Sequence, residues 1–221
     1  MSYILSIETA TKNCSVALSL NGNTIVCKEI AEEQFSHAEK LHIFIADVLK
    51  SQQLTLSNLI AIAVSKGPGS YTGLRIGVSA AKGLCYALNI PLIAVDTLAV
   101  LAAAVKVESG IVLPMIDARR MEVFTQSFTF EGTALNNAYA LIIEEDSLND
   151  LNETIHLCGD GAFKCKDVLT NVNITFHDDV VYPSANDISK LAYDNFLNNT
   201  FEDVAYFEPF YLKDFMLTTK K

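Results

Sequence analysis

Residues 66–77 constrain the fold of this chain more than any other part of the sequence. A short apolar run over 59–64, typical of a buried strand, precedes them, and an apolar helical pattern follows over 72–89. The intervening residues read Lys-Gly-Pro-Gly-Ser-Tyr-Thr-Gly, and glycine permits the positive φ angles and close backbone contacts of a tight turn. A strand, a glycine-rich turn and a helix in this order indicate an α/β fold.

The order of the remaining patterns predicts two similar halves. In the first half we expect strands over 3–8, 14–20, 24–30, 59–64 and 91–95, and helices over 36–50, 72–89 and 97–106. Asn21-Gly22 signals a hairpin, and Ser36 with Glu39 forms a capping box. In the second half we expect strands over 112–117, 122–130, 138–143, 155–158 and 173–176, and helices over 146–151, 162–169 and 184–197. Each half reads roughly βββαβαβα, which divides the chain into lobes 1–106 and 107–221.

The net negative charge of the chain lies in its second half. The formal net charge is −10, but residues 1–110 contain 8 basic and 8 acidic side chains, whereas residues 111–221 contain 8 and 18. This acidity argues against a protein that binds nucleic acid alone. Residues 48–95 contain no carboxylate and carry Lys50, Lys66, Arg75 and Lys82, either as solvated cations or as a face for an acidic partner, phosphate or RNA.

Composition and cysteine usage limit the location of the protein. Half of the residues are hydrophobic and 19% are charged, which excludes a disordered chain. The longest apolar run, 98–105, is far too short to cross a bilayer, and the N-terminus lacks a signal-peptide pattern. The five scattered cysteines contain no CxxC pair. We therefore expect a cytoplasmic protein with reduced thiols and no membrane contact.

The helix expected over 72–89 has an unusually wide apolar surface. Its apolar residues fill roughly 20° to 240° of the helical wheel, about twice the stripe of a surface helix. It must be covered on two sides, either within the chain or at a subunit interface shared with helix 36–50. For the interface we expect the following partner-binding residues: Leu41, Ile43, Ile45, Val48, Gly73, Leu74, Gly77, Ala80, Ala81 and Leu84.

Two segments have the chemistry of an anion site. A helix that opens directly after a glycine-rich turn offers free amides, and a strand that ends in Glu8 leads into a polar turn. The turn is not a Walker loop, and its GxGxxxG spacing is one residue too long for a dinucleotide fingerprint. The candidate anion- or phosphate-binding residues are Glu8, Thr9, Thr11, Gly67, Gly69, Ser70, Thr72 and Arg75.

Three motifs together resemble the bacterial TsaB family. They are Ile-Leu-Ser-Ile-Glu-Thr-Ala-Thr-Lys-Asn-Cys-Ser-Val-Ala-Leu from Ile4, the Ser-His-Ala-Glu helix start, and Lys-Gly-Pro-Gly-Ser-Tyr-Thr-Gly-Leu-Arg-Ile-Gly from Lys66. Gly159-Asp160-Gly161 and Pro209-Phe210-Tyr211-Leu212 resemble the family more weakly. The resemblance implies an actin-like (ASKHA) α/β fold of two RNase-H-like lobes. It also implies an accessory role in forming threonylcarbamoyladenosine on tRNA, beside the catalytic paralogue TsaD and the ATPase TsaE.

The histidines distinguish this chain from the catalytic paralogue, which has two metal-binding histidines four residues apart. His37 and His42 are five residues apart, so a helix turns them about 140° from each other. We therefore expect no catalytic residue, no metal and no cofactor of its own, with ATP and metal used by partner subunits. We expect a homodimer when the chain is alone, and tRNA contact only within the complex. The alternatives are an independent actin-like ATPase or phosphotransferase, a metallopeptidase and a direct RNA-binding protein.

Overall fold

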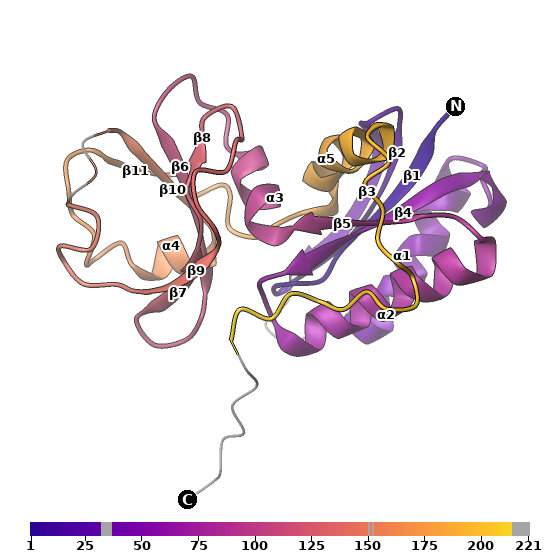
Figure 1. Cartoon of the computed structure of the whole chain (residues 1–221), viewed down its shortest axis with the longest axis horizontal. Helices are drawn as coiled ribbons and strands as arrows, with labels where there is room; N and C mark the ends of the chain where they lie inside the picture. Colours follow the sequence, from indigo (N-terminus) through magenta and orange to yellow (C-terminus); the bar gives the residue numbers. More distant parts are fainter. Residues whose placement is uncertain (32–36, 150, 152, 214–221) are drawn as a thin grey trace, which may run out of the picture.

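The computed structural model describes residues 1–31, 37–149, 151 and 153–213, which form two lobes side by side (Figure 1). The first lobe contains a five-stranded sheet in the order β3-β2-β1-β4-β5. Its strands are β1 (Tyr3–Glu8), β2 (Asn13–Leu20), β3 (Asn23–Ala31), β4 (Leu59–Gly67) and β5 (Leu92–Asp96). β2 is antiparallel to both β1 and β3, whereas β4 is parallel to β1 and β5 is parallel to β4.

The second sheet repeats this topology. Its strands are β6 (Ile111–Asp117), β7 (Glu122–Thr125), β8 (Phe128–Thr129), β9 (Tyr139–Ile142), β10 (Ile155–Cys158) and β11 (Ile174–Phe176). They lie in the order β11-β10-β6-β7-β9, with β8 paired to β6. With β8 set aside and strands counted from the start of each lobe, both sheets have the order 3-2-1-4-5. The predicted duplication of topology is confirmed.

Of the helices in the structure, α3 (Thr97–Ala104) and α5 (Ala185–Leu197) contact the lobe that does not directly precede them in the chain, whereas α1 (His37–Ser51) and α2 (Tyr71–Leu88) stay with the first lobe. α1 and α2 cover one face of the first sheet, where Leu41, Val48 and Ala81 join its core. α5 covers the opposite face, where Ile188 and Ala192 pack with residues of β1, β4 and β5. α3 follows β5 but also packs on β6 of the second lobe. Each lobe therefore contributes its last helix to the other.

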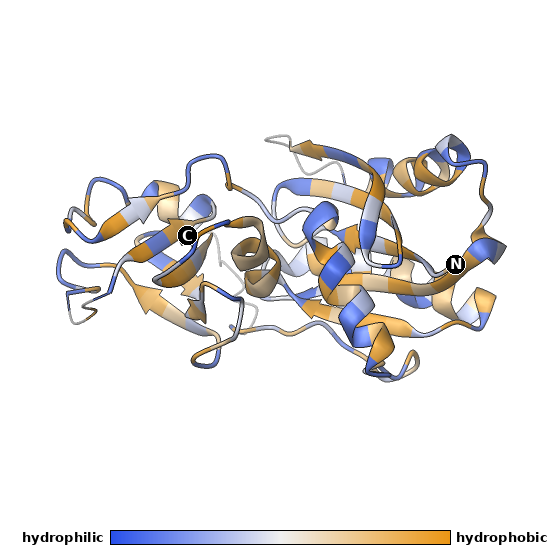
Figure 2. Ribbon diagram, turned by 90° about the horizontal axis from the view of Figure 1, so that it is seen from above, coloured by the Kyte–Doolittle hydropathy of each residue, from blue (hydrophilic) through white to orange (hydrophobic). Residues whose placement is uncertain are grey.

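The position of α5 differs from its place in the chain. The predicted division into 1–106 and 107–221 puts α5 in the second lobe, but its buried side chains lie in the core of the first. The helix between the lobes, α3, is hydrophobic along its length (Figure 2). Its Leu98 and Leu101 are fully buried in a core shared with Val112 and Phe128. Helix α3 therefore joins the two lobes through an apolar contact.

Several expected elements of the second lobe are wrong in detail. The strand expected over 122–130 is broken, because the Ser127 amide bonds to Asn136 Oδ1 at 2.9 Å and β8 then pairs with β6. The helix expected over 146–151 is a turn over 145–149. α4 (Asp160–Lys164) begins earlier and is shorter than the expected 162–169. In the first lobe, Leu56–Asn58 forms an unexpected 3-10 turn. The Ser36 cap lies outside the described residues.

None of the helices in the described ranges is long and apolar enough to cross a membrane.

Candidate functional sites: an inter-lobe cleft and a helical face

The loops that follow equivalent strands of the two sheets converge between the lobes. They follow β1 and β4 in the first lobe and β6 and β10 in the second, and they enclose a cleft of about 540 Å³. Ligands in open α/β sheets commonly bind at the carboxyl ends of strands, where such loops meet. The lining residues are Ala10, Thr11, Lys12, Gly69, Ser70, Tyr71, Thr72, Ile116, Asp117, Ala118, Arg119, Phe124 and Asp160.

The glycine-rich loop packs on the turn after β1. Thr9 Oγ1 donates to the Gly73 carbonyl at 2.8 Å, and the Ser70 amide donates to the Ala10 carbonyl at 2.7 Å. A Cβ on Gly69 would lie 2.4 Å from that same carbonyl oxygen. The glycine is therefore required for close contact between two loops of this chain, and the Ser70 amide is not free for an anion.

The buried side chain of Glu8 holds the turn after β1 through hydrogen bonds. Its side chain is fully buried and accepts hydrogen bonds from the Ala10 amide, at 2.6 Å, and from the Ser65 hydroxyl. Burial raises the pKa of Glu8 to about 7, against the lowering effect of these hydrogen bonds. The carboxyl group of Glu8 therefore holds the loop in place and does not line the cleft.

The candidate anion residues fall into two groups. Thr11, Gly69, Ser70 and Thr72 line the cleft. Glu8, Thr9, Gly67 and Arg75 do not line it. Gly67 has a φ of 120°, and a Cβ there would lie 2.3 Å from the Phe210 carbonyl oxygen. Sequence patterns select loops that meet at the cleft, but they cannot show which of the side chains are already used inside the chain.

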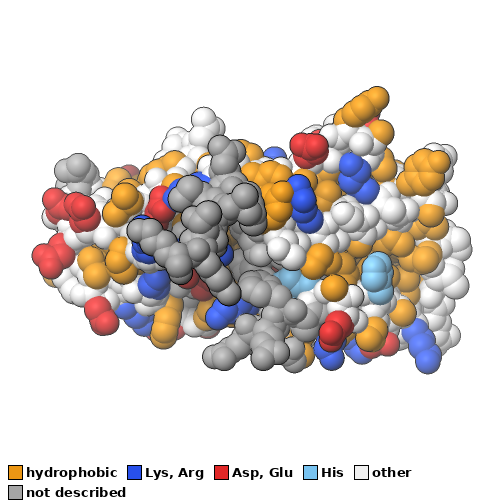
Figure 3. Space-filling model, turned by 90° about the horizontal axis from the view of Figure 1, so that it is seen from below, with side chains coloured by type: hydrophobic (Ala, Val, Ile, Leu, Met, Phe, Trp, Pro, Cys, Tyr) orange, Lys and Arg blue, Asp and Glu red, His pale blue; other side chains and the backbone are white. Residues whose placement is uncertain are grey.

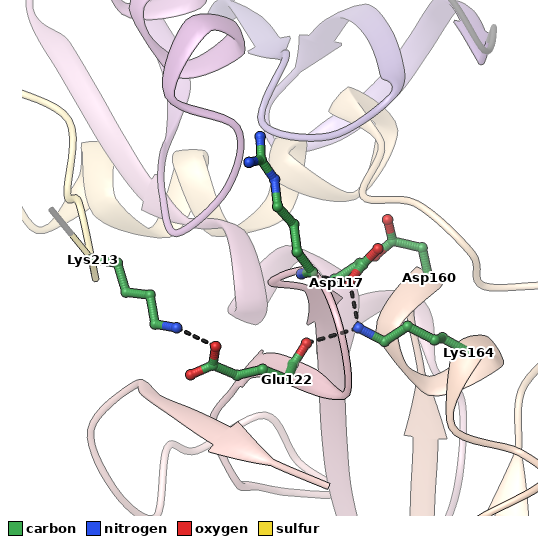
Figure 4. Close-up of polar contacts among 6 residues, drawn as sticks. Asp117, Glu122, Asp160, Lys164 and Lys213 are labelled. Carbon is green, nitrogen blue, oxygen red and sulfur yellow. Dashed lines mark hydrogen bonds and ion pairs between the residues drawn. The ribbon is translucent and has the colours of Figure 1, made fainter. Parts of the chain in front are cut away.

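The second-lobe wall of the cleft carries a network of ion pairs (Figure 4). Lys164 reaches Asp117 and donates to the Glu122 carbonyl at 2.8 Å, and Lys213 reaches the Glu122 carboxylate. Asp160 Oδ1 accepts from the Asp117 amide at 2.9 Å, and burial raises the pKa of this aspartate. The sequence pattern had marked only Gly159-Asp160-Gly161, because nothing in the sequence shows that two strand ends meet here.

The turn between β6 and β7 contains two arginines in a strained conformation. Arg119 and Arg120 have φ angles of 73° and 51°, in the left-handed region. Non-glycine residues in that region cost of order 1–3 kcal/mol each. The Arg119 amide donates to Asp117 Oδ1 at 2.8 Å, and the Glu122 amide donates to the Arg119 carbonyl at 3.2 Å. Both arginines are exposed, and the sequence reading did not select them.

Most of the residues expected to bind a partner face the core of this chain. Seven of the ten are buried: Leu41, Ile45, Val48, Gly73, Leu74, Gly77 and Ala81. A Cβ on Gly73 would lie 2.1 Å from the Thr9 carbonyl oxygen, and one on Gly77 would lie 2.3 Å from Thr9 Oγ1. These glycines let α2 approach the turn after β1. The seven buried residues are therefore unavailable to another protein.

The outer face of α1 and α2 nevertheless carries apolar side chains (Figure 3). We define the α1–α2 strip as Ile43, Phe44, Ile76, Ala80, Gly83 and Leu84. Ile43 is 55% exposed, and Ile76, Ala80 and Leu84 are half-buried. A Cβ on Gly83 would meet nothing within 4 Å. An exposed glycine inside a helix costs about 1 kcal/mol relative to alanine. No contact within the described chain explains why a glycine occupies this position.

The C-terminal strap, residues 204–213, runs along α2 (Figure 1). Lys82 donates to the Phe207 carbonyl at 2.8 Å, and Arg75 Nε donates to the Tyr211 hydroxyl at 3.1 Å. The Lys66 carbonyl accepts from the Phe210 amide at 2.7 Å, and the Lys66 ammonium pairs with Asp96. Three of the four cations in the acid-free stretch 48–95 therefore have partners inside this chain.

The histidines are separated by their surroundings. His37 is buried and its Nε2 lies 2.8 Å from the Thr11 carbonyl oxygen, whereas His42 is exposed. His156 Nδ1 lies 3.0 Å from His177 Nε2 in the second lobe. Across the described ranges, no three His, Cys, Asp or Glu side chains are placed to hold one metal ion.

Comparison with known proteins matches residues 26–215 to the family model of TsaD, tRNA N6-adenosine threonylcarbamoyltransferase. The chain is 29% identical to the tRNA threonylcarbamoyladenosine biosynthesis protein TsaB of Escherichia coli over 220 residues, 96% of this chain and 94% of that protein. YeaZ from Pseudomonas aeruginosa has 28% identity and a TM-score of 0.84, with 96% of this chain and 100% of that chain covered.

A more distant likeness concerns the fold alone. Component A of (R)-2-hydroxyglutaryl-CoA dehydratase from Acidaminococcus fermentans is 10% identical, with a TM-score of 0.53 over 88% of this chain and 99% of that one. Together with the duplicated sheet order, this likeness confirms the predicted actin-like fold class.

Proposed function

Because the chain belongs to the TsaD family, in which its relative of similar length from Escherichia coli is named TsaB, we propose that it is an accessory subunit in tRNA threonylcarbamoyladenosine synthesis. It binds and activates a TsaD-like catalytic subunit in the cytoplasm, and a TsaE-like ATPase joins the assembly. The catalytic subunit transfers a threonylcarbamoyl group from its adenylate to an adenosine of tRNA.

The observation that carries this proposal is the α1–α2 strip. Ile43 stands more than half exposed, and Gly83 leaves open space in the middle of α2. A partner of the same family has equivalent helices, and a small residue allows two helices to approach closely. Alone, the same strip pairs with a second copy of the chain in an isologous dimer.

The first-lobe loops support a non-catalytic role. The glycine-rich loop rests on the turn after β1, and Glu8 and Thr9 are bonded inside the chain. Two of the candidate phosphate-binding side chains, Glu8 and Thr9, are thus used inside the chain, whereas Thr11 lines the cleft. We accordingly propose that partner subunits hold the ATP and the metal. A metal-dependent ATP titration of the isolated chain tests the competing ATPase hypothesis, and tight binding with turnover would favour it.

The direct test measures tRNA modification by the TsaD-like enzyme and the adenylate, with and without this chain. We expect modification only when the chain is present. Ile43→Glu and Gly83→Arg place a charge on the α1–α2 strip and touch no core residue, so they abolish partner binding while the thermal unfolding transition is retained. Lys190→Glu is the matched control, because α5 covers the opposite face of the sheet.

The outcome against the docking proposal is equally clear. Partner binding and stimulation that are unchanged in both strip variants would show that the partner docks elsewhere. Gly77 is unsuitable for this test, because a side chain there collides with Thr9 of the same chain.

A further inference from the structure

Three cationic side chains at the inter-lobe cleft have no partner within the described chain. Lys12 of the first lobe and Arg119 of the second line the cleft, and Arg120 lies beside Arg119 on the surface. In the part of the chain that the structure describes, none of the three forms an ion pair or a side-chain hydrogen bond. All three are exposed.

Two of the three neighbouring carboxylates already have a cationic partner. Asp117 pairs with Lys164, Glu122 pairs with Lys213, and Asp160 accepts a backbone amide. This group contains five cations, Lys12, Arg119, Arg120, Lys164 and Lys213, against three carboxylates. This group of side chains therefore has two more cations than carboxylates in a protein whose net charge is −10, whereas the charged residues that line the cleft itself are balanced.

The hairpin turn that joins the antiparallel strands β6 and β7 contains both arginines. Arg119 and Arg120 occupy consecutive left-handed positions, where glycine or asparagine would be easier. Among the described residues, neither guanidinium forms an ion pair or a hydrogen bond that would stabilise the turn. Guanidinium groups bind phosphate in a bidentate manner, so two adjacent arginines are suited to a chain of phosphates.

We propose that Arg119, Arg120 and Lys12 form a contact site for the phosphate backbone of tRNA. This inference rests on the proposed function, which supplies the polyanion. A free nucleotide fits less well, since the Ser70 and Ala10 amides that would hold its phosphates are bonded inside the chain. The cations lie on both lobes, so one RNA strand spans the mouth of the cleft.

The test uses the complete complex of this chain with the TsaD-like enzyme. The Arg119→Gln/Arg120→Gln variant removes two charges and leaves every described ion pair intact. We expect tRNA affinity to fall about tenfold at moderate salt, and the slope of log K against log salt to fall by about 2, one for each phosphate contact. Lys12→Gln lowers the slope by about 1. The KM for tRNA rises while kcat is retained.

Two controls separate charge from structure. Arg119→Lys/Arg120→Lys keeps both charges and retains most of the salt slope. Lys190→Gln removes one charge from α5, on the far face of the first sheet, and leaves affinity and slope unchanged. Thermal unfolding of each variant verifies the fold.

The possible results are distinct. A wild-type complex that modifies no tRNA overturns the proposed function, whatever the variants do. A working wild-type complex with unchanged affinity and slope in the double variant overturns the phosphate site alone. Loss of the TsaD-like partner in the absence of RNA would make these arginines a protein contact. Arginine-dependent binding of pyrophosphate or ATP by the isolated chain would identify a nucleotide site. Both of these results overturn the inference.

Discussion

Glu8 makes the stability of this protein depend on pH in a way that the structure quantifies. Its carboxyl group is fully buried, and its pKa rises from 4.5 to about 7, chiefly through loss of water contact. Each pKa unit corresponds to about 1.4 kcal/mol, so ionising Glu8 in the folded chain costs about 3 kcal/mol. Because the pKa is raised in the folded state, the free energy of unfolding is highest below about pH 4.5. It decreases by about 3 kcal/mol as the pH increases from there through about 7.

The perturbation is Glu8→Gln. The amide is neutral at every pH, still accepts from the Ala10 amide and can donate to Ser65. We expect the free energies of unfolding of the variant and the wild type to be similar below about pH 4.5. Relative to the wild type, the variant should gain about 3 kcal/mol as the pH increases from about 4.5 to about 7, and nothing further above pH 7.

Urea denaturation followed by circular dichroism, repeated from about pH 4 to about pH 9, measures this difference. The Ser65→Ala variant provides a matched check, since the Ser65 hydrogen bond lowers the pKa of Glu8, and its removal moves the upper end of the pH window upward. A stability difference between wild type and Glu8→Gln that does not change with pH would refute the argument. A Glu8 carboxyl carbon signal that titrates near 4.5 in NMR spectra would refute it as well.

Three further predictions concern packing and charge. Gly77→Val forces a Cβ toward Thr9 Oγ1, and we expect thermal unfolding to show a loss of at least about 1–3 kcal/mol; an undiminished melting temperature would contradict the packing of α2. Lys82→Ala removes a hydrogen bond to the C-terminal strap, so limited proteolysis should cut the strap faster while global stability changes by at most about 1 kcal/mol. The pKa of His177 is lowered by burial and by His156, so its contribution to stability is present above about pH 6.5 and is lost as the pH falls. The His177→Asn variant should reduce this loss of stability at low pH, measured by denaturation curves. An unaltered loss would exclude the histidine pair as its cause.

The sequence alone identified the repeated order of strands and helices. Alternating and continuous apolar runs placed β1 to β5, α1 and α2 close to their observed positions, because these segments bury side chains with regular periodicity. The second lobe was less accurate. Its short strands β7 and β8 and its short helix α4 are determined by pairing with β6 and by the turn at Gly159. Local patterns carry little information about such contacts.

The candidate sites show the same division. The sequence predicts that residues 66–77 and the turn after Glu8 are important for function, and that the wide apolar surface of α2 is covered on two sides. Only the tertiary structure shows that Gly73 and Gly77 face Thr9, and that Arg119 reaches the cleft from the other lobe. Periodicity measures how much apolar surface a helix has, but it cannot tell which surface covers it. That choice depends on contacts between residues far apart in the chain, and these exist only when the two lobes have packed together.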